Sequence, residues 1–140
     1  MSDIVYNKFA YNLATKQISL LVDDIKVALF PSTFTPNALT QNVWADISAD
    51  ECTGVGYTAG GESLASKTVT EVETGAGGVK FDSADVTWSS STITARYAVL
   101  YDDTVATKDL IACYDFVTDK VSSGGDFVLT VNAAGWFLIS

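Results

Sequence analysis

Hydrophobic and polar residues alternate along most of this chain with a period of two, which is typical of β-strands that bury one face. In DIKVALF (24–30), the apolar residues Ile25, Val27 and Leu29 occupy alternate positions. The longest alternation is TITARYAVLYD (92–102), and it predicts one strand face formed by Ile93, Ala95, Tyr97, Val99 and Tyr101. Further strands are predicted at 43–48, 66–73, 79–88, 109–117, 126–131 and 136–140. Turns rich in Gly, Ser, Asn and Asp separate these strands, so neighbouring strands are expected to be antiparallel.

The N-terminal residues follow a different pattern. In KFAYNLATKQISLL (8–21), Phe9 and Leu13, together with the alanines at 10 and 14, recur at helical spacing. This segment predicts one or two helical turns, or an arm that becomes ordered on a partner. A loop that contains both prolines, PSTFTPNALTQN (31–42), follows the first predicted strand.

These elements predict an all-β domain: a single antiparallel β-sandwich, jelly-roll or immunoglobulin-like, or else a closed barrel, with a short N-terminal helix or arm. The strands follow one another too closely for crossover helices, which argues against a parallel sheet. The 140 residues suit one domain with its own hydrophobic core. We expect residues 1–20 to form the arm or helix and residues 21–140 to form the sandwich.

The charge of the chain limits its partners. The formal net charge is −9, with eight scattered basic residues against 17 acidic ones. Binding to nucleic acid or to an anionic membrane requires clustered Lys and Arg, so neither partner is expected. Charged residues make up only 18% of the chain, which favours a subunit that covers part of its surface in an assembly.

Residue types that support catalysis are scarce. The chain has no histidine, which removes the commonest general base and metal ligand and every Ser-His or Cys-His pair. Cys52 and Cys113 lack a CxxC partner and are expected to be buried thiols, with a disulfide as the alternative. The start of the chain does not resemble a signal peptide, and no apolar run is long enough to span a membrane, so synthesis in a cytoplasm is expected. We expect no cofactor and no metal.

The segment GVGYTAGGESL (54–64) resembles two phosphate-binding motifs in its glycine spacing. Both motifs require a buried strand before the loop and a helix after it, but polar residues precede this segment and an alternating strand pattern follows it. Glu62 also occupies the position at which a phosphate site needs lysine. We therefore interpret the segment as a structural bend against which Tyr57 packs.

Acidic pairs and aromatic residues are the other candidates for chemistry. The pairs are Asp23 with Asp24, Asp50 with Glu51, Asp82 with Asp85, and Asp102 with Asp103. Calcium ligation and glycoside hydrolysis are conceivable for such pairs, but capping of turns is the favoured interpretation. Trp44, Trp88 and Trp136 are expected in the core, with a sugar-binding aromatic surface as the alternative.

Four segments together resemble a family of small structural proteins from tailed-bacteriophage virions. They are LATKQISLLVDDIKVALFPSTFTPN (13–37), GVGYTAGGESLASKTVT (54–70), KFDSADVTWSSSTITARYAVLYDD (80–103) and GGDFVLTVNAAGWFLIS (124–140). The resemblance covers nearly the whole chain, with the motifs in the same order. Where the family pattern has a Trp before the last Asn-Ala, this chain has Val131.

The resemblance implies a virion component without enzymatic activity, and the sequence favours a capsid decoration, or cement, protein. Its expected partners are the major capsid protein and copies of itself, as in a homotrimer, on the outer capsid surface. A tail, baseplate or head-fibre component is the alternative, and a glycan-binding surface module is a more distant one. The contacts are expected in residues 4–18 and 31–42, with the 54–61 loop as a further candidate. The interface residues predicted by this reasoning are Tyr6, Phe9, Tyr11, Leu13, Phe34 and Tyr57.

Overall fold

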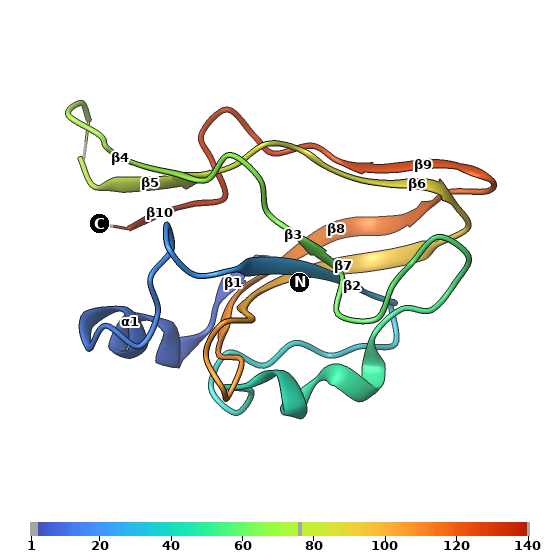
Figure 1. The fold of residues 1–140 in the computed structure, drawn as a ribbon, viewed down its shortest axis with the longest axis horizontal. Coiled ribbons are helices and arrows are strands. Elements are labelled where there is room, and N and C mark those ends of the chain that lie inside the picture. Colours follow the sequence, from blue (N-terminus) through green and yellow to red (C-terminus); the bar gives the residue numbers. More distant parts are fainter. Residues whose placement is uncertain (1–2, 76, 140) are drawn as a thin grey trace.

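The computed structural model describes residues 3–75 and 77–139 and shows two β-layers packed face to face (Figure 1). One layer is an antiparallel sheet with the strand order β1 (Ile4–Val5), β8 (Leu110–Val121), β7 (Thr94–Asp102), β2 (Ile25–Phe30) and β3 (Glu62–Ser63). The other layer contains one three-stranded sheet, β10 (Phe137–Ile139), β5 (Val79–Asp82) and β4 (Thr68–Glu71), and one two-stranded sheet, β6 (Val86–Ser91) and β9 (Gly125–Leu129). The prediction of an all-β sandwich with a short N-terminal helix is confirmed.

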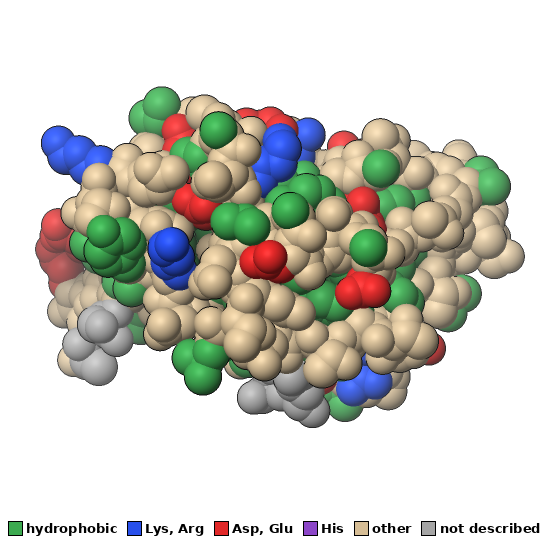
Figure 2. Space-filling view, turned by 90° about the horizontal axis from the view of Figure 1, so that it is seen from below, with side chains coloured by type: hydrophobic (Ala, Val, Ile, Leu, Met, Phe, Trp, Pro, Cys, Tyr) green, Lys and Arg blue, Asp and Glu red, His purple; other side chains and the backbone are tan. Residues whose placement is uncertain are grey.

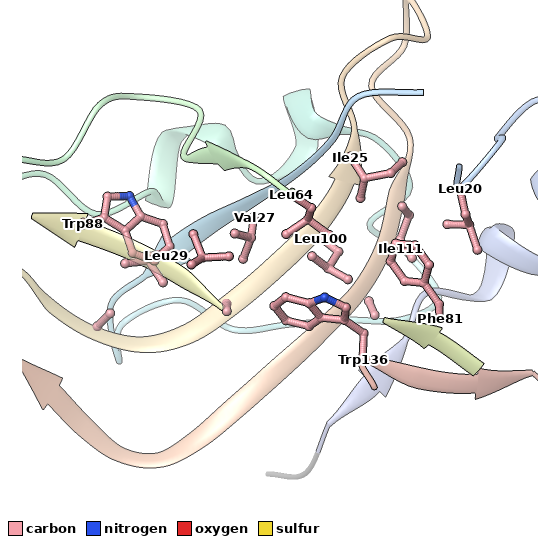
Figure 3. Packing of buried hydrophobic residues seen from close by; sticks show 14 of the residues in the cluster. Leu20, Ile25, Val27, Leu29, Leu64, Phe81, Trp88, Leu100, Ile111 and Trp136 are labelled. Atoms are coloured by element: carbon pink, nitrogen blue, oxygen red, sulfur yellow. The ribbon is translucent and has the colours of Figure 1, made fainter. Parts of the chain in front are cut away.

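The main hydrophobic core lies between the two layers (Figure 3). Ile25, Val27 and Leu29 project into it from β2, as the alternation predicts, and all three are fully buried. The second layer contributes Trp88 from β6 and Phe81 from β5. Each of these strands turns one face toward this core, so residues at alternate positions of a strand enter it together.

A second core covers the opposite face of the five-stranded sheet. Ala28 and Phe30, the intervening residues of β2, are also fully buried and pack with Phe34 from the proline-containing loop. Two short 3-10 helices continue this cover, η1 (Trp44–Asp46) and η2 (Ser48–Asp50). The central strand β2 is therefore buried on both faces, by a sheet on one side and by the 31–50 segment on the other.

The strand predicted at 43–48 is wrong, because this segment forms η1 and the start of η2. The Asp46 carboxylate accepts hydrogen bonds from the N–H groups of Asn42 and Val43, at 2.8 and 3.1 Å. These local bonds stabilise a tight turn and also hold the pKa of Asp46 below its usual value.

The N-terminal segment packs against the domain. Strand β1 pairs with β8, and helix α1 (Asn7–Ala14) begins directly after Tyr6. Phe9 from the helix joins the main core, where its ring makes an edge-on contact with Phe137 at 5.5 Å between centroids. Ile18 and Leu20, which follow the helix, join the same core. The helical prediction for this segment is confirmed.

The predicted single face of 93–101 is wrong in one respect. Ile93 and Ala95 lie in the main core, whereas Tyr97, Val99 and Tyr101 lie in the second core. A β-bulge between β7 and β8 shifts the register between Ala95 and Tyr97 and so reverses the alternation.

Candidate functional site

The glycine loop between η2 and β3 lies directly on the backbone of β2 and of the connection between β6 and β7. A Cβ atom added at Gly61 would lie 1.9 Å from the carbonyl oxygen of Val27, and one at Gly54 would lie 2.3 Å from that of Thr92. Both glycines have positive φ, at 77° and 156°. The glycines therefore permit a close approach of two backbones, which favours the interpretation of this segment as a structural bend over a phosphate site.

Tyr57 anchors this loop from the inside. Its hydroxyl donates a hydrogen bond to the Glu51 carboxylate at 2.6 Å and accepts one from the N–H of Leu29 at 2.9 Å. The Gly60 N–H also donates to Glu51, at 2.8 Å. Burial raises the pKa of Glu51, although these two hydrogen bonds favour its charged form. Tyr57, which the sequence placed at an interface, thus joins the loop to β2.

A polar groove of about 490 Å³ opens beside this loop. The Trp44 ring stacks on Tyr101 with 4.3 Å between centroids, and the Tyr101 hydroxyl donates to the Gly60 carbonyl oxygen at 2.6 Å. Asp103 pairs with Lys26 at 3.3 Å and with Lys108 at the groove edge. Burial favours the neutral form of Asp103, but hydrogen bonds from the two lysines outweigh it and hold its pKa low.

Two acidic residues of the predicted pairs accept backbone N–H groups, Asp82 from the next residue and Asp85 from across the ends of β6 and β9. The Asp82 carboxylate accepts a hydrogen bond from the N–H of Ser83 at 2.8 Å, and Asp85 accepts one from the N–H of Val131 at 2.8 Å. Within residues 3–75 and 77–139, no group of three or more Cys, Asp or Glu side chains is arranged to hold a metal ion.

Asp102 differs from the other acidic residues of these pairs because its side chain is fully buried, beside Asp23. One of its oxygens accepts the N–H of Thr104 at 3.0 Å. Burial first, and then the neighbouring Asp23, raise the pKa of Asp102 to about 7. Asp102 is enclosed by the protein, so this pair lacks the access to a sugar substrate that glycoside hydrolysis requires.

Cys52 and Cys113 are buried free thiols, which confirms the favoured prediction for them. Burial raises the pKa of each to about 12. Both thiols therefore remain protonated at neutral pH and lack nucleophilic character.

The structure separates the predicted interface residues into two groups. Tyr6, Phe9 and Phe34 are 1%, 3% and 2% exposed, so the expectation that they contact a partner is corrected. The reason is that α1 and the 31–42 loop use these side chains to cover the sandwich itself. Tyr11, on the outer side of α1, is 65% exposed and is available to a partner, and Leu13 is half-buried.

An apolar surface lies at the end of the molecule that carries α1 and β10. Sequence reasoning predicted a contact in residues 4–18, which form part of this surface, but missed the contribution of residues 19–22 and of β10. Two adjoining grooves of about 360 and 480 Å³ lie there and share Leu13 and Ile139. We call this the end surface, and it is formed by residues 5, 9, 10, 13, 14, 18–22, 69, 79 and 137–139. The run of Leu20, Leu21 and Val22 outside any strand was the signal that could have revealed it. By contrast, hydrophobic side chains are scattered among polar atoms on the face viewed in Figure 2.

No helix in the described part of the chain has the length and apolarity needed to span a membrane. Comparisons with known protein families, with curated proteins and with solved structures found no match to this chain. The candidate sites are therefore identified from the structure. They are the polar groove at Trp44 and the apolar end surface.

Proposed function

We propose that this protein is a non-enzymatic structural component of a tailed-bacteriophage virion, and that it binds the outer capsid surface as a decoration protein. The observation that carries the proposal is that residues in the segments of the family resemblance stabilise the fold. Tyr57 and Gly61 fix a loop to the sheet, and Phe81 and Trp88 fill the core between the layers. The resemblance therefore concerns a fold and its stability, which suits a structural protein.

The net charge of −9 supports a position on the outside of the shell. An acidic protein is repelled by packaged DNA, which carries a dense negative charge, so the lumen is unfavourable for it. Its expected partners are the major capsid protein and further copies of this chain.

Stabilisation of the shell would be mechanical. Packaged DNA pushes the capsid outward, and apolar contacts that span two capsid subunits oppose their separation. At about 25 cal/mol per Å², burying about 400 Å² of apolar surface contributes about 10 kcal/mol before the costs of ordering are subtracted. Repetition of such a contact over a whole shell makes even a small net contribution effective.

The proposal is tested by separating DNA-filled heads from tails and quantifying this protein in each by mass spectrometry. A decoration protein should remain with tail-free heads, at a copy number comparable to that of the capsid protein. Recovery in the tail fraction at low copy number would instead support a tail, baseplate or fibre component, and absence from both would refute a virion role.

The contact residue is tested by adding variants back to heads that lack the protein. Deletion of residues 1–12 would remove the buried Tyr6 and Phe9, so a point substitution is cleaner. We expect Tyr11→Ala to weaken binding to heads, and Val128→Ala, at a 52% exposed position on β9, to leave it unchanged. Equal binding of both variants would show that α1 is not the anchor.

A glycan-binding module is the second candidate, favoured by the groove at Trp44. An aromatic ring beside charged and hydroxyl groups is a suitable arrangement for stacking and hydrogen-bonding a sugar. Titration with host cell-surface polysaccharide should then change tryptophan fluorescence, and Trp44→Ala should abolish the change. An unchanged spectrum would exclude this function for the polysaccharide used.

A further inference from the structure

The end surface is unusual in this acidic chain because it carries no charge. Among the described residues that line its two grooves, all are apolar except Ser19. Several are strongly exposed: Val22 is 84%, Leu21 53%, Val5 51% and Leu138 49% exposed. A contiguous exposed apolar area of this kind on a soluble protein marks a contact surface.

Strand β10 forms an open sheet edge inside this surface. The sheet order is β10-β5-β4, so β5 occupies one side of β10 and no described strand occupies the other. Leu138 lies in the middle of β10, and its side chain lines the groove next to α1. An unpaired edge with apolar side chains is a template for pairing with another strand.

Three of the other edge strands, β4, β3 and β9, carry charge in or beside the strand. Strand β4, at the opposite edge of the same sheet, ends at Glu71 and is preceded by Lys67. The edge strands β3 and β9 contain Glu62 and Asp126. Charged residues on an edge prevent unwanted strand pairing, and β10 (Phe137–Ile139) contains none. The edge strands β1 (Ile4–Val5) and β6 (Val86–Ser91) also lack charge, and β1 contributes Val5 to the end surface, so this surface brings together two uncharged edge strands.

We infer that the end surface binds a second copy of this chain, with the two β10 strands pairing antiparallel across a twofold axis. The end surface offers apolar area from four strongly exposed side chains, Val22, Leu21, Val5 and Leu138. A standard interface buries about 800 Å² per partner, of which a little over half is apolar, so exposed apolar side chains of this kind are what such an interface uses.

Charge favours a second copy over a different protein. The chain has a net charge of −9, and a partner recognised by electrostatics would need basic residues facing acidic ones. The end surface offers no charge for such recognition, and it is also the place where two acidic copies can meet with least repulsion. An antiparallel pair of identical edges is self-complementary, because each strand presents the same hydrogen-bonding groups to the other. The twofold pair differs from the homotrimer expected from the family resemblance, and it goes beyond the proposed function because it requires no capsid.

The test compares Leu138→Lys with Val128→Lys by sedimentation velocity over a range of protein concentrations. Both positions are about half exposed on edge strands, at 49% and 52%, but Val128 lies outside the end surface. We expect the unaltered protein and Val128→Lys to form dimers, and Leu138→Lys to remain monomeric with unchanged circular dichroism. A monomeric unaltered protein at all concentrations, or a Leu138→Lys variant that dimerises as well as the control, would overturn the inference.

A cross-linking experiment covers the case in which Leu138→Lys perturbs folding. The native thiols Cys52 and Cys113 are buried, so a new surface cysteine is the reactive one. Under mild oxidation, Leu138→Cys should form a disulfide-linked dimer, because the two β10 strands bring position 138 close to its mate. Val128→Cys should stay monomeric. Equal cross-linking of the two variants, or none at position 138, would contradict pairing through β10.

Discussion

The close approach of the glycine loop to β2 predicts a large difference between two chemically identical substitutions. Gly61→Ala would introduce a Cβ 1.9 Å from the carbonyl oxygen of Val27. The atoms that it would meet are backbone atoms of β2, so the clash can be relieved only by moving the loop or the strand. Gly124 has a similar backbone conformation, with φ of 72° against 77° at Gly61, but a Cβ there would meet no atom within 4 Å. Gly124→Ala is therefore a matched control for the cost of positive φ alone.

The expected magnitudes follow from these geometries. A non-glycine residue in the left-handed region costs about 1–2 kcal/mol, which is the whole cost expected for Gly124→Ala. Gly61→Ala adds displacement of the loop from the sheet and disturbance of the bonds that Tyr57 and Tyr101 make to it, so we expect a total loss of about 4 kcal/mol.

Urea unfolding followed by tryptophan fluorescence would measure both free energies of unfolding, and Trp88, whose ring stacks near Tyr57, would report on the loop. The reasoning would be refuted if Gly61→Ala lost no more stability than Gly124→Ala. That result would mean that the loop moves away from β2 at little cost and that its glycines are not required for packing.

Three further predictions concern single side chains. Val117 has φ of 71° in the β7–β8 bulge and is 71% exposed. Val117→Gly should relieve this strain, increase the free energy of unfolding by about 1 kcal/mol and so raise the thermal midpoint. Tyr57→Phe removes two hydrogen bonds and leaves a backbone N–H of β2 unpaired, which should cost about 1–3 kcal/mol in urea unfolding. The pKa of Asp102 is raised in the folded protein from 3.8 to about 7, so its contribution to stability is complete below about pH 4 and is lost as the pH rises to 7. Asp102→Asn should flatten this part of the curve of unfolding free energy against pH, and an unaltered slope would show that another group causes it.

Local patterns predicted most of the strands, with β1 and β3 missed and the strand at 43–48 wrong, but they did not predict the arrangement of the strand faces. The alternation of Ile25, Val27 and Leu29 encodes the main core. Ala28 and Phe30, on the other face of β2, are equally buried because the 31–50 segment covers that face. A period of two reports one buried face and is silent about a loop that covers the second. The bulge between β7 and β8 is likewise a property of two strands together, and neither sequence alone reveals it.

The sequence also did not distinguish residues that contact a partner from residues that cover the chain's own core. Phe9 and Phe34 lie outside the strand pattern, and this made them candidates for contact with a partner, but both cover the chain's own core. Helical spacing shows that a face is apolar and does not show what it packs against. Leu138 occupies the outward position of β10, between the half-buried Phe137 and Ile139, and a strand pattern does not show whether anything covers that face.

The central claim, that this protein strengthens a capsid shell by binding to it, is tested most directly by heating DNA-filled heads that lack the protein, with and without the purified chain added back. Release of DNA, detected with an intercalating dye, gives the temperature at which the shell fails. The account predicts that added protein binds to the heads and raises this temperature until its sites are full. Heads that bind the protein and fail at an unchanged temperature, or that do not bind it at all, would contradict the account.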